Sequence, residues 1–142
     1  MKMTLNPLEF SSLQLDLQES SEELRPHMSE AEISCLQRHL QATNTLVEFG
    51  SGGSTLLAVK TKVKNIFSVE SDLGWVEKLK KEPLIQNALK NKQLRFISPD
   101  LGLVGAWGRP CDITKKADWY LYHSAVWQKV DKEVVPVCET AG

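Results

Sequence analysis

Two carboxylates and a run of glycines and hydroxyls are the residues of this sequence that suit ligand chemistry. In residues 46–55, a short apolar run ends at Glu48 and is followed by glycines and hydroxyl side chains. Glycines leave no Cβ between the backbone and a ligand, and hydroxyls at a helix start add hydrogen bonds. The order predicts a buried strand, a tight turn and a helix whose free N–H groups face the turn. We therefore expect a nucleotide-type ligand site here.

The turn fits some ligand classes better than others. Glu48 adds a negative charge, which suits a ligand with an ammonium or sulfonium better than one carrying only phosphates. No lysine lies between Gly50 and Lys60, so a phosphate-binding P-loop is disfavoured. The dinucleotide pattern G-x-G-x-x-G begins at Gly50, but Thr55 stands where its third glycine belongs. An NAD-type dinucleotide binder and an ordinary strand-to-helix connection remain as alternatives.

A second carboxylate follows a second apolar run. Residues 65–69 predict a strand, and Glu70 ends it twenty positions after Gly50, where a ribose-binding acid belongs in a βαβ unit. Asp72 could substitute for Glu70, but we favour Asp72 as the N-cap of the next helix. A third strand is expected at residues 93–98, and Asp100 follows it.

Three motifs in this order resemble the Rossmann-like (class I) methyltransferases that depend on S-adenosylmethionine (SAM). Glu48-Phe49-Gly50-Ser51-Gly52 resembles their first motif, acidic-x-Gly-x-Gly after an apolar strand, although Ser54 replaces a common third glycine. With Ser68-Val69-Glu70-Ser71-Asp72 and the glycine-rich loop of residues 100–110, which holds Trp107, it is similar to a poorly characterised bacterial methyltransferase-like group. The resemblance covers roughly residues 29 to 127.

The resemblance implies SAM as the cofactor and a role for each motif. The methionine carboxylate is expected on the glycine turn, which consists of Gly50, Ser51, Gly52, Gly53, Ser54 and Thr55. Glu48 would lie near the ammonium, Glu70 would take the ribose hydroxyls and Asp100 would approach the adenine. A plain turn residue is an equally good interpretation of Asp100. No residue is assigned as catalytic, and the methyl acceptor is an unknown small molecule.

The expected fold class is α/β, a partial Rossmann-like three-layer sandwich with a mainly parallel sheet. Residues 1–28 form an N-terminal arm whose order the sequence leaves open, and residues 29–142 form the SAM-binding domain. Ser29 and Glu32 predict a capping box that opens a helix running to about Ala42.

The C-terminal part departs from the methyltransferase pattern. Aromatic residues 119–127 predict a helix whose stripe serves the core or an interface, and His123 there has no evident partner. Residues 134–138 could form a short strand, but Pro136 cannot donate to a sheet. We expect a C-terminally truncated relative that lacks the later strands of a full methyltransferase.

Loss of the fourth strand would leave residues 45–49 as an unpaired apolar edge, because the first strand is central in the complete fold. Such an edge predicts a homodimer or a larger homo-oligomer. A non-catalytic, oligomeric interaction module with this fold is therefore the alternative function.

Composition is that of a compact cytoplasmic domain. Of 142 residues, 42% are hydrophobic and 25% charged, and the net charge of -1 does not favour a nucleic-acid partner. Basic residues gather between positions 58 and 95, which we interpret as solvated helix faces. Cys35, Cys111 and Cys138 are odd in number and widely spaced, as expected of reduced thiols rather than disulfides or a zinc site. No targeting signal or membrane span is predicted.

Overall fold

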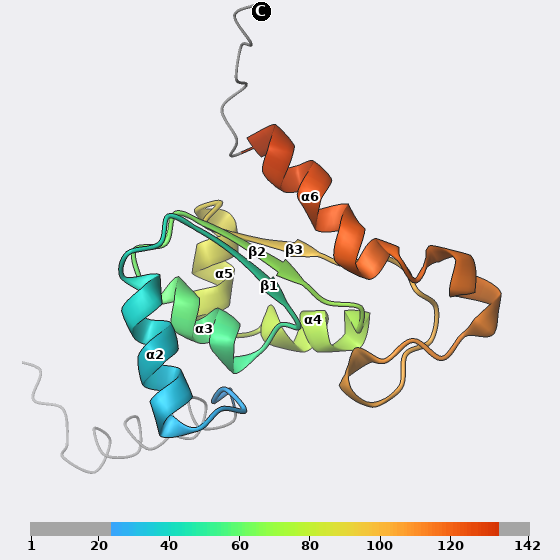
Figure 1. Ribbon diagram of the computed structural model, residues 1–142, viewed down its shortest axis with the longest axis horizontal. Coiled ribbons are helices and arrows are strands. Elements are labelled where there is room, and N and C mark those ends of the chain that lie inside the picture. Colours follow the sequence, from blue (N-terminus) through green and yellow to red (C-terminus); the bar gives the residue numbers. More distant parts are fainter. Residues whose placement is uncertain (1–23, 134–142) are drawn as a thin grey trace, which may run out of the picture.

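The computed structural model describes residues 24–133, in which strands and helices alternate (Figure 1). The regular elements are α2 Glu30–Leu40, β1 Thr45–Phe49, α3 Gly53–Val59, β2 Asn65–Val69, α4 Leu73–Leu79, α5 Pro83–Lys90, β3 Leu94–Ile97 and α6 Leu121–Glu133, with 3-10 turns at Ala106–Gly108 and Ile113–Asp118. All three predicted strands are present. The residues predicted as an N-terminal arm lie outside this range up to position 23, as does the possible strand 134–138.

The three strands form one parallel sheet in the order β1-β2-β3. Glu48 on β1 lies opposite Ser68 on β2, and Ile66 on β2 lies opposite Leu94 on β3. The carboxyl ends of the strands therefore meet at one edge, where parallel α/β folds bind their ligands. Within residues 24–133, β1 pairs on one side only, so the predicted open edge is confirmed for this part. The predicted homodimer stays a prediction.

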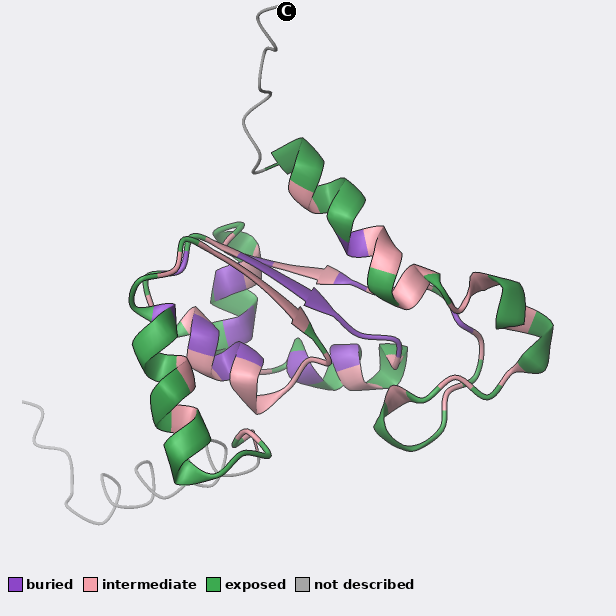
Figure 2. Cartoon of the chain, in the orientation of Figure 1, coloured by how far each residue is buried: buried purple, intermediate pink, exposed green. Residues whose placement is uncertain are grey.

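Helices cover both faces of the sheet, which gives three layers (Figure 1). On one face, Ile66 of β2 packs with Leu56 of α3 and Ile85 of α5. On the other face, Phe67 of β2 packs with Val126 of α6. The two neighbours on β2 point to opposite faces because side chains alternate along a strand. Figure 2 shows β2 buried along most of its length, as expected of a central parallel strand, and the predicted three-layer α/β fold is confirmed.

The N-termini of α2 and α4 are capped by the residues that the sequence predicted. The Ser29 hydroxyl accepts from the backbone N–H of Glu32 at 3.3 Å, and the Glu32 carboxylate accepts from the N–H of Ser29 at 2.7 Å. This reciprocal capping box opens α2. Asp72 caps α4 by accepting from the N–H of Trp75 at 3.1 Å. The cap position of Asp72 is therefore confirmed.

Three further features concern the cysteines, the helices and the side chains that could bind a metal ion. Cys35 and Cys111 are exposed free thiols, and Cys138 lies outside the described residues. None of the helices in residues 24–133 has the length and apolar character needed to span a bilayer. Over the same range, no group of three or more His, Cys, Asp or Glu side chains is placed to hold a metal ion.

Candidate functional site

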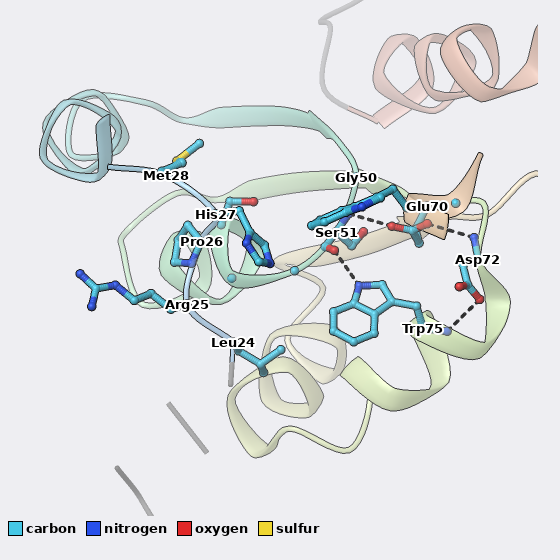
Figure 3. A pocket seen from close by; sticks show the side chains of 15 residues that line it. Leu24, Arg25, Pro26, His27, Met28, Gly50, Ser51, Glu70, Asp72 and Trp75 are labelled. Atoms are coloured by element: carbon cyan, nitrogen blue, oxygen red, sulfur yellow. Dashed lines mark hydrogen bonds between the residues drawn. The ribbon is translucent and has the colours of Figure 1, made fainter. Parts of the chain in front are cut away.

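A pocket of about 480 Å³ opens where the turns after β1 and β2 meet the segment that precedes α2 (Figure 3). Its volume is in the range of ~300–1,000 Å³ typical of small-molecule sites. It is lined by residues 24–28, Gly50, Ser51, Gly52, Gly53, Ser54, Glu70, Asp72, Trp75, Trp107 and Gly108. We call residues 24–28 the N-terminal strap and residues 102–110 the tryptophan loop. The fold thus brings together Glu70 and most of the predicted glycine turn.

The glycine turn has two positions that only glycine fits. Gly50 has a φ of +89°, and its N–H donates to the Val69 carbonyl at 2.8 Å, which ties the turn to the end of β2. A Cβ on Gly53 would lie 2.2 Å from the Leu24 carbonyl oxygen, so the strap packs directly on the backbone there. Glycine at position 50 therefore permits the sharp turn, and glycine at position 53 allows the strap to pack directly on the backbone.

Glu48 lies under the turn rather than in the pocket wall. Its carboxylate accepts hydrogen bonds from the hydroxyls of Ser54 at 2.9 Å, Ser68 at 2.6 Å and Thr55. Burial raises the pKa of Glu48, and the three hydroxyl donors only partly oppose that shift. Thr55 is itself fully buried and also accepts from the N–H of Gly52 at 2.9 Å. The structure thus gives Glu48 and Thr55 the task of holding the turn, and their contact with a ligand stays a prediction.

Glu70 lies in the pocket wall, with its carboxylate held from two sides. One oxygen accepts from the N–H of Ser51 and the other from the N–H of Asp72, both at 3.0 Å (Figure 3). The residue is only 7% exposed, although its carboxylate borders the pocket. Two fixed backbone donors set the plane of the carboxylate and leave further lone pairs for a ligand.

Sequence reasoning missed Trp75 as a site residue. Its indole Nε1–H donates to the Ser51 carbonyl at 2.7 Å, so the ring both lines the pocket and anchors the turn (Figure 3). Trp75 lies in the first turn of α4, where it is half-buried. The signal that could have revealed it is the indole N–H, because a buried indole needs an acceptor.

The sequence did not predict the strap as part of the site, and it identified the tryptophan loop as a motif without a role in the site. His27 of the strap meets Trp107 of the loop with ring centroids 5.0 Å apart and planes at 79°. The Arg25 guanidinium pairs with Glu30 and points away from Glu70 (Figure 3). Glu70 and Asp72 therefore supply the acidic groups of the pocket wall, which favours a ligand with a positive charge.

Asp100 is not among the residues that line the pocket. Its carboxylate accepts from the N–H of Gly102 at 3.0 Å and lies 3.8 Å from the Lys115 ammonium. The side chain is 72% exposed, as is common in a turn. The placement matches the turn interpretation, and a contact of Asp100 with adenine stays a prediction.

The chain is similar to a methyltransferase-like protein from Silicibacter pomeroyi DSS-3, known from its crystal structure, at 30% sequence identity and a TM-score of 0.61. The chain has a methyltransferase-like fold. The match covers 74% of this chain and 55% of that protein, so the chain spans little more than half of its length. No family model matches the chain, and no curated protein does. The predicted resemblance to Rossmann-like methyltransferases is confirmed.

Proposed function

We propose that this methyltransferase-like chain binds S-adenosylmethionine in the pocket beside Glu70. The observation that supports this most is the placement of the Glu70 carboxylate in one pocket with Gly50 and Ser51 of the glycine turn. A carboxylate fixed by two backbone N–H groups is oriented to accept from a pair of vicinal hydroxyls, such as those of a ribose. The pocket volume of about 480 Å³ suits one ligand of nucleoside size with a short side chain.

The methionine carboxylate and the sulfonium of SAM can each be matched to groups along the same pocket wall. The turn from Gly50 to Ser54 is free of bulky side chains, and it suits the carboxylate of the methionine group. Glu48 supports that turn from below through the hydroxyls of Ser54 and Thr55. The acidic pair Glu70 and Asp72 lowers the cost of bringing a sulfonium into the pocket.

SAM supplies a methyl group on a sulfonium that is reactive toward nucleophiles, and the protein's part in such chemistry is chiefly to position the two reactants. We propose an unknown small molecule as the acceptor and the cytoplasm as the compartment. The described residues offer no side chain that we assign as catalytic. The proposal therefore concerns binding first and methyl transfer second.

Calorimetric titration of the full chain with SAM, S-adenosylhomocysteine and NAD tests the proposal. We expect saturable binding of both sulfur nucleosides and none of NAD, because Thr55 stands where a dinucleotide site has its third glycine. Absence of heat with all three ligands, for a chain shown to be folded by circular dichroism, would contradict the proposal. Preference for NAD would contradict it as well.

A second candidate is an interaction module in which a second copy covers β1. Phe49 at the end of this open strand is 46% exposed, and Trp127 of α6 is 49% exposed with its ring centroid 6.5 Å away. Exposed aromatics beside an open strand are suited to association. Light scattering after size-exclusion chromatography tests this idea. A dimer that Trp127→Ala dissociates would support it, and a monomer at micromolar concentration would contradict it.

A further inference from the structure

Trp107 stands at the tip of a tight loop. Val104 and Pro110 form an antiparallel bridge, and the N–H of Gly105 donates to the Arg109 carbonyl at 2.7 Å. Between them, residues 106–108 make one short 3-10 turn that carries the indole outward. The base of the tryptophan loop is thus closed by backbone bonds, and its tip projects the largest side chain.

Trp107 has a strained backbone conformation and buries little of its surface. The residue has φ 60° and ψ 27°, a left-handed conformation that a bulky residue rarely adopts. Its side chain is 86% exposed, so packing within the chain does not offset that cost. Among residues 24–133, its recorded aromatic contact is with His27 of the strap. Such outliers gather at ligand clamps, where a ligand completes the contacts.

The loop is fixed beside the carboxylate that faces the pocket. The hydroxyl of Ser71 donates to the Gly108 carbonyl at 2.7 Å. Gly108 has a φ of +69°, and a Cβ there would lie 3.0 Å from the Glu70 carboxylate. Trp107 is the residue before Gly108, and it lines the same pocket as Glu70. A ribose bound by Glu70 would therefore have its base within reach of the indole.

We propose that Trp107 covers the nucleoside of the bound ligand, with its indole against the purine and His27 bracing the ring at its edge. This inference rests on the proposed binding of SAM and assigns the cover of the pocket to two residues from distant segments. The centroids of the two rings already lie 5.0 Å apart, so the two residues that would cover the ligand are in contact before it binds. A planar purine fits an exposed indole face because every base offers a π-surface for stacking.

Calorimetry with S-adenosylhomocysteine on the full chain and three variants measures the contribution of the ring. We expect Trp107→Ala to weaken binding by about ten- to hundred-fold, the range for loss of one stacked aromatic, and Trp107→Phe to stay close to the parent. Trp127→Ala is the matched control, because Trp127 is also exposed at 49% but does not line the pocket. It should leave the affinity unchanged.

Tryptophan fluorescence gives a second readout, which reports on the surroundings of the indole itself. Because Trp107 is 86% exposed, its coverage by the ligand should shift the emission to shorter wavelength. Trp107→Phe should remove most of that shift, whereas Trp127→Phe should retain it. Unchanged affinity in Trp107→Ala, or a shift as large in Trp107→Phe as in the parent, would overturn this inference alone if the parent binds. A parent chain that binds no sulfur nucleoside would overturn both this inference and the proposed function.

Discussion

Glu48 and Glu70 each end an apolar run of the sequence, but they have different partners in the structure. Glu48 is the next-to-last residue of β1, and Glu70 lies one residue beyond β2. Glu48 accepts from three side-chain hydroxyls under the glycine turn, whereas Glu70 accepts from two backbone N–H groups in the pocket wall. The difference teaches that a motif carboxylate can support a ligand site or face the ligand, depending on which donors its neighbours present.

The parallel register explains the difference. Glu48 lies opposite Ser68 on β2, so the serine hydroxyl reaches the carboxylate from the neighbouring strand. Thr55, in the first turn of α3, donates its hydroxyl to the same carboxylate from the helix side. Glu70 lies one residue beyond β2, where the turn after β1 presents the backbone N–H of Ser51. The Glu48 carboxylate is therefore hydrogen-bonded to side-chain hydroxyls, whereas backbone N–H groups orient the Glu70 carboxylate.

Removal of the Glu48 side chain should have the largest effect on stability. Glu48→Ala leaves the hydroxyls of Ser54, Thr55 and Ser68 without their shared acceptor in a largely buried place. We expect a loss of about 2–4 kcal/mol in the free energy of unfolding, measured with urea. Glu77→Ala is the control, because this side chain is 72% exposed and makes one surface ion pair with Lys80. Equal losses in both variants would remove the distinction between buried support and surface charge.

A side chain at position 108 should disturb the Glu70 region instead. In Gly108→Ala, the new Cβ would lie 2.9 Å from the Ser71 hydroxyl in a backbone with a φ of +69°. We expect a loss of about 1–3 kcal/mol in unfolding free energy from the left-handed backbone and the crowding. Gly105→Ala in the same loop is the control, since its Cβ would meet nothing closer than 3.7 Å. If the two variants unfold alike, the loop is not seated on Ser71 and Glu70 as described.

Trp75→Phe tests the anchor between α4 and the glycine turn. The variant keeps an aromatic ring but loses the indole hydrogen bond to the Ser51 carbonyl. We expect a loss of about 1 kcal/mol in urea unfolding, the usual net value of one hydrogen bond. Within residues 24–133, the Trp127 indole on α6 makes no hydrogen bond, so Trp127→Phe should unfold close to the parent. A larger loss in Trp127→Phe than in Trp75→Phe would contradict this assignment.

The pH dependence of stability should show the smallest effect. Because burial raises the pKa of Glu48, the folded chain binds this proton more tightly than the unfolded chain does. Stability from this group therefore increases as the pH falls through the raised pKa and is complete below 4.5, the ordinary value. Glu48→Gln lacks the titrating group, so the parent should gain stability over it on acidification from neutral pH. Parallel stability curves for the two proteins would show that the fold does not raise the pKa of Glu48.

Local sequence rules predicted the scaffold because each rule acts over a few residues. The capping box of Ser29 and Glu32 and the cap at Asp72 follow from side chains that bond three positions away. The open side of β1 was predicted from the doubly wound strand order, in which the first strand is central. Placement of Glu70 beside the turn followed from the same topology.

The pocket wall opposite the turn could not be predicted in this way. The contact between His27 and Trp107 joins residues eighty positions apart, and no periodic pattern links them. The seat of the strap on Gly53 depends on a backbone approach that local sequence does not encode. The three hydroxyl hydrogen bonds to Glu48 could not be predicted without the register between β1 and β2, because that register fixes the position of Ser68.

The central claim is that Glu70, and not Glu48, faces the ligand. Titration of the parent, Glu70→Ala and Glu48→Gln with S-adenosylhomocysteine in one calorimetric series tests it most directly. We predict that Glu70→Ala weakens binding by about 1–3 kcal/mol through loss of the ribose hydrogen bonds, while Glu48→Gln stays within about 0.5 kcal/mol of the parent. Unchanged affinity in Glu70→Ala together with a large loss in Glu48→Gln would contradict the account.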